Sequence, residues 1–302
     1  MKSRPASVFI KPLLTLAFPV LMAVNAQAAI INHLDVDFND YPLGPLTTAG
    51  TSFTGISNAT GVTSSYTVES LSATDRVLHV VKSGGTSSVT LRTTPAPDNP
   101  TGTQELKITA NSSYVWSFDF QAPTTPDQGA FFRLDDGAAS AGRYIAGLRL
   151  SGGTISYLTN PNTETLTSQM TAIPTDVLSV QAGVWYEVSF SINSFSAPGA
   201  NPANVGLSYD FTITRRGESE PAFSTSVVNL MPSALKAIDP GYNNSVRMGM
   251  SFTGSTIDND FYLDNIRLRT IPEPGVSLLM ISGLGVGVWM TRRRLARHTG
   301  KP

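Results

Sequence analysis

Alternation of apolar and polar residues constrains the fold of this chain more than any other feature. In "YVWSFDF", at residues 114–120, four aromatic residues fall on one face and smaller or polar residues fall on the other. The same period of two recurs in "VWYEVSFSI" at 184–192, "VGLSYDFTIT" at 205–214 and "VRMGMSFTG" at 246–254. Period two is typical of a β-strand with one buried face.

Further candidate strands fill the rest of the middle of the chain, and Gly, Pro, Ser and Asn cluster between them as turn formers. These candidates are "LDVDF", "SYTVE", "RVLHVV", "SVTLR", "AFFRL", "YIAGLRL" and "GTISYL". No long stretch between residues 30 and 270 has a helical period of 3.6, and no fixed repeat suggests a solenoid or propeller. We therefore predict an all-β body at 29–270, a two-sheet antiparallel jelly-roll sandwich.

The closing segment "NDFYLDNIRLR" contains one irregularity. Leu263 and Ile266 are both apolar, yet they are one step out of phase for a regular strand. A β-bulge at Asp264 and Asn265 would restore the phase and would redirect their side chains.

The N-terminus predicts export. Basic residues precede an apolar stretch at 13–24, and Ala26-Gln27-Ala28 follows as an A-x-A cleavage site, so we expect a signal peptide at 1–28 that uses the Sec export machinery. The alternative is an uncleaved N-terminal anchor.

The C-terminus carries an apolar run at 275–290 followed by Arg292, Arg293 and Arg294 in a basic tail at 291–302. As a helix the run would extend about 24 Å, near the lower limit for crossing a membrane. The positive-inside rule keeps the arginines cytoplasmic as a membrane stop and places the body outside.

Pro272-Glu273-Pro274, the apolar run and the arginine cluster together resemble the PEP-CTERM sorting signal of Gram-negative bacteria. The resemblance covers 271–302. It implies an exosortase-like membrane partner and a carrier that first rests in the inner membrane and then reaches the cell surface or the extracellular matrix. The alternative is a plain C-terminal anchor.

The order of elements in the body also resembles the concanavalin A-like, or LamG-like, jelly roll. "VDFNDYPLGPL" at 36–46 resembles its opening strand and loop, "AGVWYEVSFSI" at 182–192 its central strand beginning with Trp, and "NDFYLDNIRLR" at 259–269 its closing strand. This fold hosts lectins, glycosidases and adhesion domains, so it does not decide the function.

Composition excludes several chemistries. The formal net charge of -1 gives no electrostatic basis for binding nucleic acid. The absence of cysteine excludes disulfides, thiolate catalysis and Cys-based zinc sites.

No catalytic motif stands out, and we predict a protein that is not an enzyme. The E-x-D-x-x-E triplet of laminarinase-like jelly rolls is missing, and Asp119, Glu187 and Asp210 each stand in a separate strand, where we expect them to be solvated. Of the three histidines only His79 lies within a candidate strand, where it is expected to be a strand residue and not a base.

Oxygen ligands for a structural Ca²⁺ are present near both ends of the body. If the first and last strands pair, Asp37 and Asp264 could meet and hold the ion, since Ca²⁺ takes six to eight oxygen ligands. The alternative is that the Asp and Asn residues there form turns and caps.

Exposed aromatic rings could serve as sugar platforms, because a ring can cover the apolar face of a pyranose. Trp185 and Tyr144 are the candidates, with Tyr157 and Tyr242 as further possibilities, and each could instead pack in the core. The resulting prediction is a non-catalytic surface or matrix protein that binds or organises exopolysaccharide in the envelope or biofilm. The alternatives are a polysaccharide-active hydrolase of the same fold and an adhesion or scaffold domain without a small ligand.

Overall fold

The computed structural model describes residues 30–47, 53–57, 63–83, 89–93, 112–122, 129–135, 144–159, 170–196, 205–230, 247–253 and 259–271. The chain divides into two compact units, one of which spans Ile31–Ile271, whereas the other joins the two chain ends. The fold described below is that of Ile31–Ile271.

A nine-stranded sheet forms one layer, in the order β14-β13-β12-β7-β16-β5-β4-β2, and β1 also pairs with β16. Its strands are β1 (Ile31–Val36), β2 (Gly44–Pro45), β4 (Thr63–Ser70), β5 (Arg76–Ser83), β7 (Ser113–Gln121), β12 (Trp185–Ser196), β13 (Val205–Arg215), β14 (Phe223–Leu230) and β16 (Asn259–Ile271).

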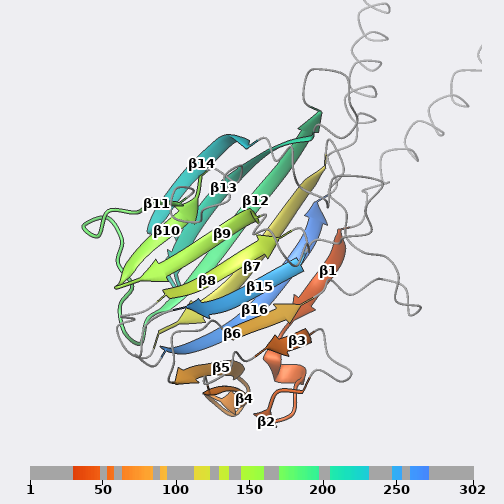
Figure 1. The fold of residues 1–302 in the computed structure, drawn as a ribbon, viewed down its shortest axis with the longest axis vertical. Helices are drawn as coiled ribbons and strands as arrows, with labels where there is room; N and C mark the ends of the chain where they lie inside the picture. Colours follow the sequence, from red (N-terminus) through yellow and green to blue (C-terminus); the bar gives the residue numbers. More distant parts are fainter. Residues whose placement is uncertain are drawn as a thin grey trace, which may run out of the picture. The chain divides into compact units, whose positions relative to one another are not determined.

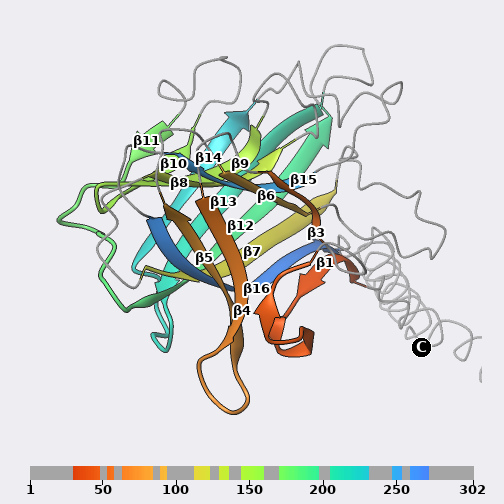
Figure 2. The same cartoon turned by 60° about the horizontal axis from the view of Figure 1, so that its bottom comes forward.

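A seven-stranded sheet forms the second layer, in the order β11-β10-β9-β8-β15-β6-β3 (Figures 1 and 2). Its strands are β3 (Phe53–Ser57), β6 (Val89–Thr93), β8 (Gly129–Asp135), β9 (Tyr144–Ser151), β10 (Thr154–Leu158), β11 (Met170–Ala172) and β15 (Arg247–Thr253). The paired strands of both sheets are antiparallel, and the prediction of an all-β, two-sheet antiparallel body is confirmed for the described residues.

The core lies between the two sheets and is rich in aromatic rings. Trp116 of β7 stacks on Phe190 of β12 with ring centroids 4.9 Å apart, and Phe190 stacks on Phe211 of β13 at 4.6 Å. Each of these side chains is completely buried. Full burial of one such side chain contributes roughly 1.5–3 kcal/mol, so the alternation seen in the sequence identifies the face that stabilises the fold.

The last strand is long and changes partner halfway. Along one edge, β5 pairs with the first part of β16, up to Leu263, and β1 pairs with the second part, from Ile266 to Thr270. Between these two parts the register against β7 shifts after Asp264, and Asn265 has a φ of 51°. The predicted bulge at Asp264 and Asn265 is thus confirmed, as is the pairing of the first and last strands.

Candidate functional site

A hollow of about 360 Å³ lies on the outer face of the nine-stranded sheet, over β16, β7, β12 and β13. Mostly polar side chains surround it. They are hydroxyl groups, carboxylates, one amide and two guanidinium groups, with two valines, and they belong to Val115, Ser117, Asp119, Glu187, Val188, Ser189, Thr212, Thr214, Asn265, Arg267 and Arg269.

Strand register explains why these residues meet. Asp119 of β7 lies directly opposite Glu187 of β12 on one side and opposite Asp264 of β16 on the other. Directly opposite residues have Cβ atoms about 4.5–5.5 Å apart. Three carboxylates from three strands therefore form one row across the sheet.

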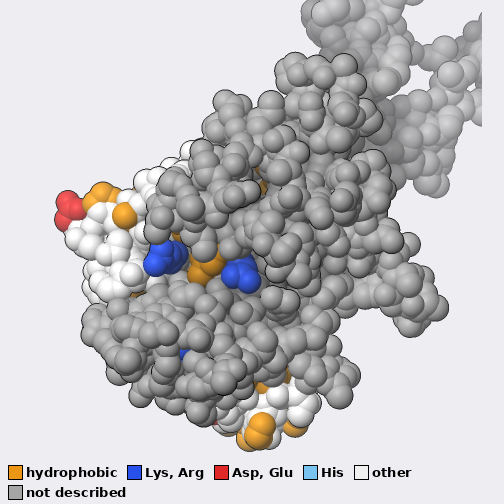
Figure 3. Space-filling model, viewed as in Figure 1, with side chains coloured by type: hydrophobic (Ala, Val, Ile, Leu, Met, Phe, Trp, Pro, Cys, Tyr) orange, Lys and Arg blue, Asp and Glu red, His pale blue; other side chains and the backbone are white. Residues whose placement is uncertain are grey.

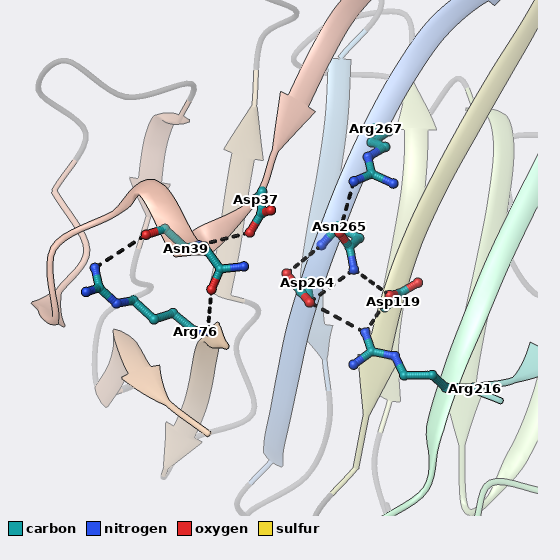
Figure 4. Close-up of polar contacts among 8 residues, drawn as sticks. All are labelled: Asp37, Asn39, Arg76, Asp119, Arg216, Asp264, Asn265 and Arg267. Atoms are coloured by element: carbon teal, nitrogen blue, oxygen red, sulfur yellow. Dashed lines mark hydrogen bonds and ion pairs between the residues drawn. The ribbon is translucent and has the colours of Figure 1, made fainter. Parts of the chain in front are cut away.

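Arg216 offsets part of this negative charge. It follows β13 directly, and its Nη2 donates to Asp119 Oδ2 at 2.6 Å and lies 3.5 Å from Asp264 Oδ2. Asn265 Nδ2 bridges the same two carboxylates, at 2.8 Å from Asp119 Oδ2 and 3.1 Å from Asp264 Oδ2 (Figure 4). The sequence predicted a solvated Asp119, but this was wrong, because these contacts leave its side chain only 13 % exposed.

Asp264 is the most perturbed acid of the site. Burial raises the pKa of Asp264 to about 6, and the charge of Asp119 acts in the same direction. The N–H of Asn265, which donates to Asp264 Oδ1 at 2.8 Å, and the charge of Arg216 oppose this rise in pKa. The Asp264 carboxyl group can therefore hold or release a proton near neutral pH.

Trp185, the first residue of β12, lies on the same sheet face as Glu187, because alternate residues of a strand share a face. Its indole is half-buried, and the Arg216 guanidinium stacks over it at 4.3 Å from the ring centroid. Arg216 thus connects Trp185 to the row of carboxylates. Of the other proposed sugar platforms, the Tyr144 side chain and Tyr242 lie outside the described part of the chain, and Tyr157 packs on the core ring of Phe211 at 5.5 Å.

Asp37 and Asp264 are brought to the same region of the sheet, but their carboxylates have different partners (Figure 4). Asp37 follows Val36, which pairs with Ile266 beside the bulge, and its carboxylate accepts a hydrogen bond from the Asn39 N–H at 2.9 Å. This contact is of the capping type that the alternative interpretation expected. The described residues contain no group of three or more His, Cys, Asp or Glu side chains that could hold a metal ion, and the calcium site stays a prediction.

A second ionic cluster surrounds His79 on the same sheet face. Its Nδ1 lies 2.8 Å from Glu69 Oε1, its Nε2 lies 2.5 Å from Asp260 Oδ1, and its ring packs on Tyr262 at 4.5 Å. Burial lowers the pKa of His79, but the hydrogen bonds and charges of the two carboxylates outweigh it, so the pKa is raised overall. His79 is a strand residue, as predicted.

The segments that carry the export and sorting predictions lie outside the described residues. They are Ala26 and Ala28 at the signal cleavage site, Pro272, Glu273 and Pro274 in the sorting motif, and Arg292, Arg293 and Arg294 in the tail. No helix in the described ranges is long and apolar enough to span a membrane.

The sequence does not reveal the central feature of the site. Paired carboxylates are recognisable in a sequence when they share one strand, whereas the structure assembles Asp119, Glu187 and Asp264 from three strands. The available signal is the bulge, which shows that the outward residues of the last strand are redirected. For Arg216 the sequence predicts only a turn.

Comparisons with known proteins find similar solved structures but no similar sequence family. No family model matches it, and no curated protein does. Among solved structures, a Shewanella oneidensis MR-1 protein of unknown function matches over 86% of this chain and 96% of its own, with 9% identity and a TM-score of 0.49.

Two further solved structures are similar at a lower level. The cellulose-induced protein Cip1 has 13% identity and a TM-score of 0.39 over 78% of this chain and 96% of its own. The carbohydrate recognition domain of Emp46p has 13% identity and a TM-score of 0.36 over 70% of this chain and 87% of its own. At these identities and TM-scores the likeness does not extend to activity.

Proposed function

We propose that this chain is an exported surface or matrix protein that binds or organises extracellular polysaccharide without cleaving it. The observation that carries the proposal is the hollow on the nine-stranded sheet, where hydroxyl, carboxylate, amide and guanidinium groups converge beside Trp185. Such groups donate to and accept from sugar hydroxyls, and a small number of convergent polar groups is typical of a ligand site. We further propose that the two sheets are connected as a jelly roll of the LamG-like kind.

A glycan array tests this function. Full-length protein in neutral detergent should bind polysaccharide fragments, and Ser189→Trp, which fills the centre of the hollow, should reduce that binding at least tenfold. Arg149→Ala, in β9 of the other sheet, is the control and should bind like the parent protein. An array on which the folded parent protein binds nothing would instead support the ligand-free scaffold.

A hydrolase is the second candidate, and the row of carboxylates is the observation that favours it. Glycoside hydrolases need two carboxyl groups about 5–5.5 Å or 6.5–9.5 Å apart, one of them protonated near neutral pH. Asp264 has a suitably raised pKa and Glu187 is exposed. Against this role, Arg216 and Asn265 already engage both Asp119 and Asp264. Release of reducing ends from a bound polysaccharide, abolished by Glu187→Gln, would establish the hydrolase.

For the chain ends we propose a signal peptide at 1–28 and a PEP-CTERM-like sorting signal at 271–302. Replacement of Pro272, Glu273 and Pro274 by alanine should leave an unprocessed, membrane-bound form in the native host, because the apolar run remains. A plain anchor would show the same mass and location in parent and mutant. A tag near Ser196 should be digested by protease in intact spheroplasts, whereas a tag after Pro302 should be protected before sorting.

A structural Ca²⁺ held by Asp37 and Asp264 also stays a proposal, supported by the pairing of β1 with β16 beside the bulge. A ligand that binds only the folded state, at a free concentration 100 times its dissociation constant, raises the free energy of unfolding by about 2.7 kcal/mol. The melting temperature should then be roughly 5–10 °C higher in calcium than in EDTA. Equal melting temperatures in calcium and in EDTA would contradict the proposed Ca²⁺ site.

A further inference from the structure

We infer that the hollow takes an acidic sugar unit of the uronate class, whose carboxylate pairs with Arg269 and Arg267. This inference rests on the proposed function and names the ligand class of the same site. It follows from the unequal distribution of charge along the hollow.

One end of the hollow offers cationic donors. Arg269 is exposed, and among the described residues its side chain has no hydrogen-bond or ion-pair partner. Arg267 is also exposed and uses its Nε for Asp35 at 3.1 Å and its Nη2 for Asn265 Oδ1 at 3.1 Å. Guanidinium has five N–H donors, so three remain, and its planar arrangement suits a carboxylate.

The other end offers acceptors. Arg269 lies opposite Val115 of β7, and Asp264 lies opposite Asp119, four residues further along the same strand. At about 3.3 Å per residue, the row of Arg269 is roughly 13 Å from the row of Asp119, and the row of Arg267, which lies opposite Ser117, is roughly 7 Å from it. An anion bound at Arg269, with Arg267 as its second partner, can therefore lie on the side away from Asp119.

Between the two ends, beyond the guanidinium group of Arg267, the lining consists of neutral hydroxyl groups. Arg267, Ser117 and Ser189 form one cross-strand row, and Thr212 continues it on β13. These hydroxyl groups can both donate to and accept from sugar hydroxyls. A ligand matched to the whole hollow carries its charge at one end and hydroxyl groups along the rest, as a uronate within a glycan chain does.

The charge that selects such a ligand is local. The formal net charge of the chain is -1, so the whole molecule does not attract a polyanion. Preference for an acidic glycan would therefore have to come from Arg267 and Arg269.

Isothermal titration of the full-length protein in neutral detergent tests the inference. The probes are hexagalacturonate, its fully methyl-esterified form, in which the charge is removed and the hydroxyl groups remain, and cellohexaose. We expect the acid to bind at least tenfold more tightly than the ester, and Arg269→Ala to weaken binding of the acid by about 10- to 100-fold with little effect on the ester. Arg269→Lys should retain part of the affinity, and Arg149→Ala should retain all of it.

The outcomes separate this inference from the proposed function. Equal affinity for acid and ester, or preference for cellohexaose, would overturn the acidic ligand and leave carbohydrate binding intact. An acid preference that survives Arg269→Ala would overturn the placement of the anion. If the folded protein binds none of these probes and no glycan on the array, both the acidic ligand and the carbohydrate-binding function are wrong.

Discussion

Asp264 and His79 lie on the same face of the nine-stranded sheet, and neighbouring side chains or burial displace the pKa of each from its ordinary value. Asp264 is 3 % exposed and has another carboxylate, Asp119, opposite it. His79 instead lies between two carboxylates, Glu69 and Asp260. The folded state therefore holds a proton more tightly than the unfolded chain at both residues, but over different ranges of pH.

Asp264→Asn should stabilise the protein at neutral pH. The pKa of Asp264 is about 6 in the folded state and 3.8 for a free aspartate side chain, so stability is lost as pH rises from about 4 to about 6. At about 1.4 kcal/mol per pH unit, the amide should raise the free energy of unfolding at pH 7 by roughly 2–3 kcal/mol. Urea unfolding in EDTA at pH 4, 5, 6 and 7 measures this, because EDTA removes any Ca²⁺ that the Asp264 carboxylate would hold.

The control for Asp264→Asn is Asp210→Asn, which removes an exposed carboxylate from the same sheet face. It should not raise the free energy of unfolding at pH 7 as Asp264→Asn does, because the Asp210 side chain is exposed to solvent. A lower stability of Asp264→Asn than of the parent at pH 7 would show that the ionised carboxylate stabilises the bulge.

His79→Gln should remove a pH dependence of stability that occurs at higher pH than that of Asp264. Because the pKa of His79 is raised above 6.5, the stabilisation by Glu69 and Asp260 is fully present below 6.5 and is lost as pH rises through the folded-state pKa. The melting temperature of the parent, followed from pH 5.5 to 8.5, should therefore fall relative to that of His79→Gln. Parallel curves for the two proteins would contradict the raised pKa.

At the scale of elements, the bulge in β16 explains how the site is assembled. Asn265 adopts a left-handed φ of 51°, and the register against β7 shifts by one residue at this position. If the same sequence formed a regular strand without the bulge, Ile266 would point outward and Arg267 would point into the core. The bulge thus places Asn265, Arg267 and Arg269 on the outer face together.

Asn265→Val should be more damaging than Asn265→Gly. Both lose the hydrogen bonds to Asp119 and Asp264, but valine must also adopt a left-handed conformation that costs about 1–2 kcal/mol and is worst for β-branched residues. Glycine adopts this conformation freely. In urea unfolding we expect valine to be the less stable variant by at least about 1 kcal/mol. Equal stabilities would mean that the backbone relaxes at the bulge.

In the seven-stranded sheet, an aromatic ring lies close to a glycine of the neighbouring strand. An added Cβ at Gly147 would lie 2.9 Å from Phe131 Cε2, so the ring lies almost against the backbone of β9. Arg133 in turn stacks over Phe131 at 5.8 Å from the ring centroid. Figure 3 shows Lys or Arg side chains beside apolar ones on the face in view. Arg149 of β9, which pairs with Phe131 of β8, belongs to this sheet and not to the hollow, so it is a suitable control residue.

Period two predicted the inner strands well because those strands bury one face. β7, β12 and β13 begin and end close to the predicted segments. The strands that the sequence did not predict are β2, β3, β11 and β14, and each is at the edge of its sheet. An edge strand has a neighbour on one side only and needs less apolar sequence, so alternation is weaker there.

The site was less predictable than the strands. Alternation shows that Asp119 and Glu187 point outward, but it does not show which residues lie opposite each other on strands that are far apart in the sequence. That register depends on the packing of the whole core. The role of Arg216 was even harder to predict from the sequence. Its position depends on the turn after β13 and on its stacking against Trp185.

At the scale of the whole molecule, the first and last strands of the sandwich bring the start and the end of the described fold side by side. Ile31, which begins β1, pairs with Thr270, close to the end of β16. Paired residues of antiparallel strands have Cα atoms about 4.5–5.5 Å apart. The chain therefore enters and leaves the described fold at one place.

A circular permutant should accordingly fold. Residues 31–271 would be joined by a short Gly-Ser linker and opened between Ser72 and Ala73, in the exposed turn before β5. We expect a cooperative thermal transition within about 5–10 °C of that of the parent, because a short loop closure costs only a few kcal/mol. Failure to unfold cooperatively would show that residues 1–30 or 272–302 contribute to the fold.

The course of β16 also has a mechanical consequence. This strand supplies Asn265, Arg267 and Arg269 to the hollow and continues to Ile271, directly before the C-terminal segment. A pull between a glycan in the hollow and a tethered C-terminus would load β16 along its length, against the ladders to β7, β5 and β1. Hydrogen bonds loaded lengthwise must shear together, whereas bonds at a peeled edge break one after another. If the C-terminus is tethered as proposed, tension between it and a bound glycan would thus act on the strand of the sandwich that is held by ladders along both of its edges.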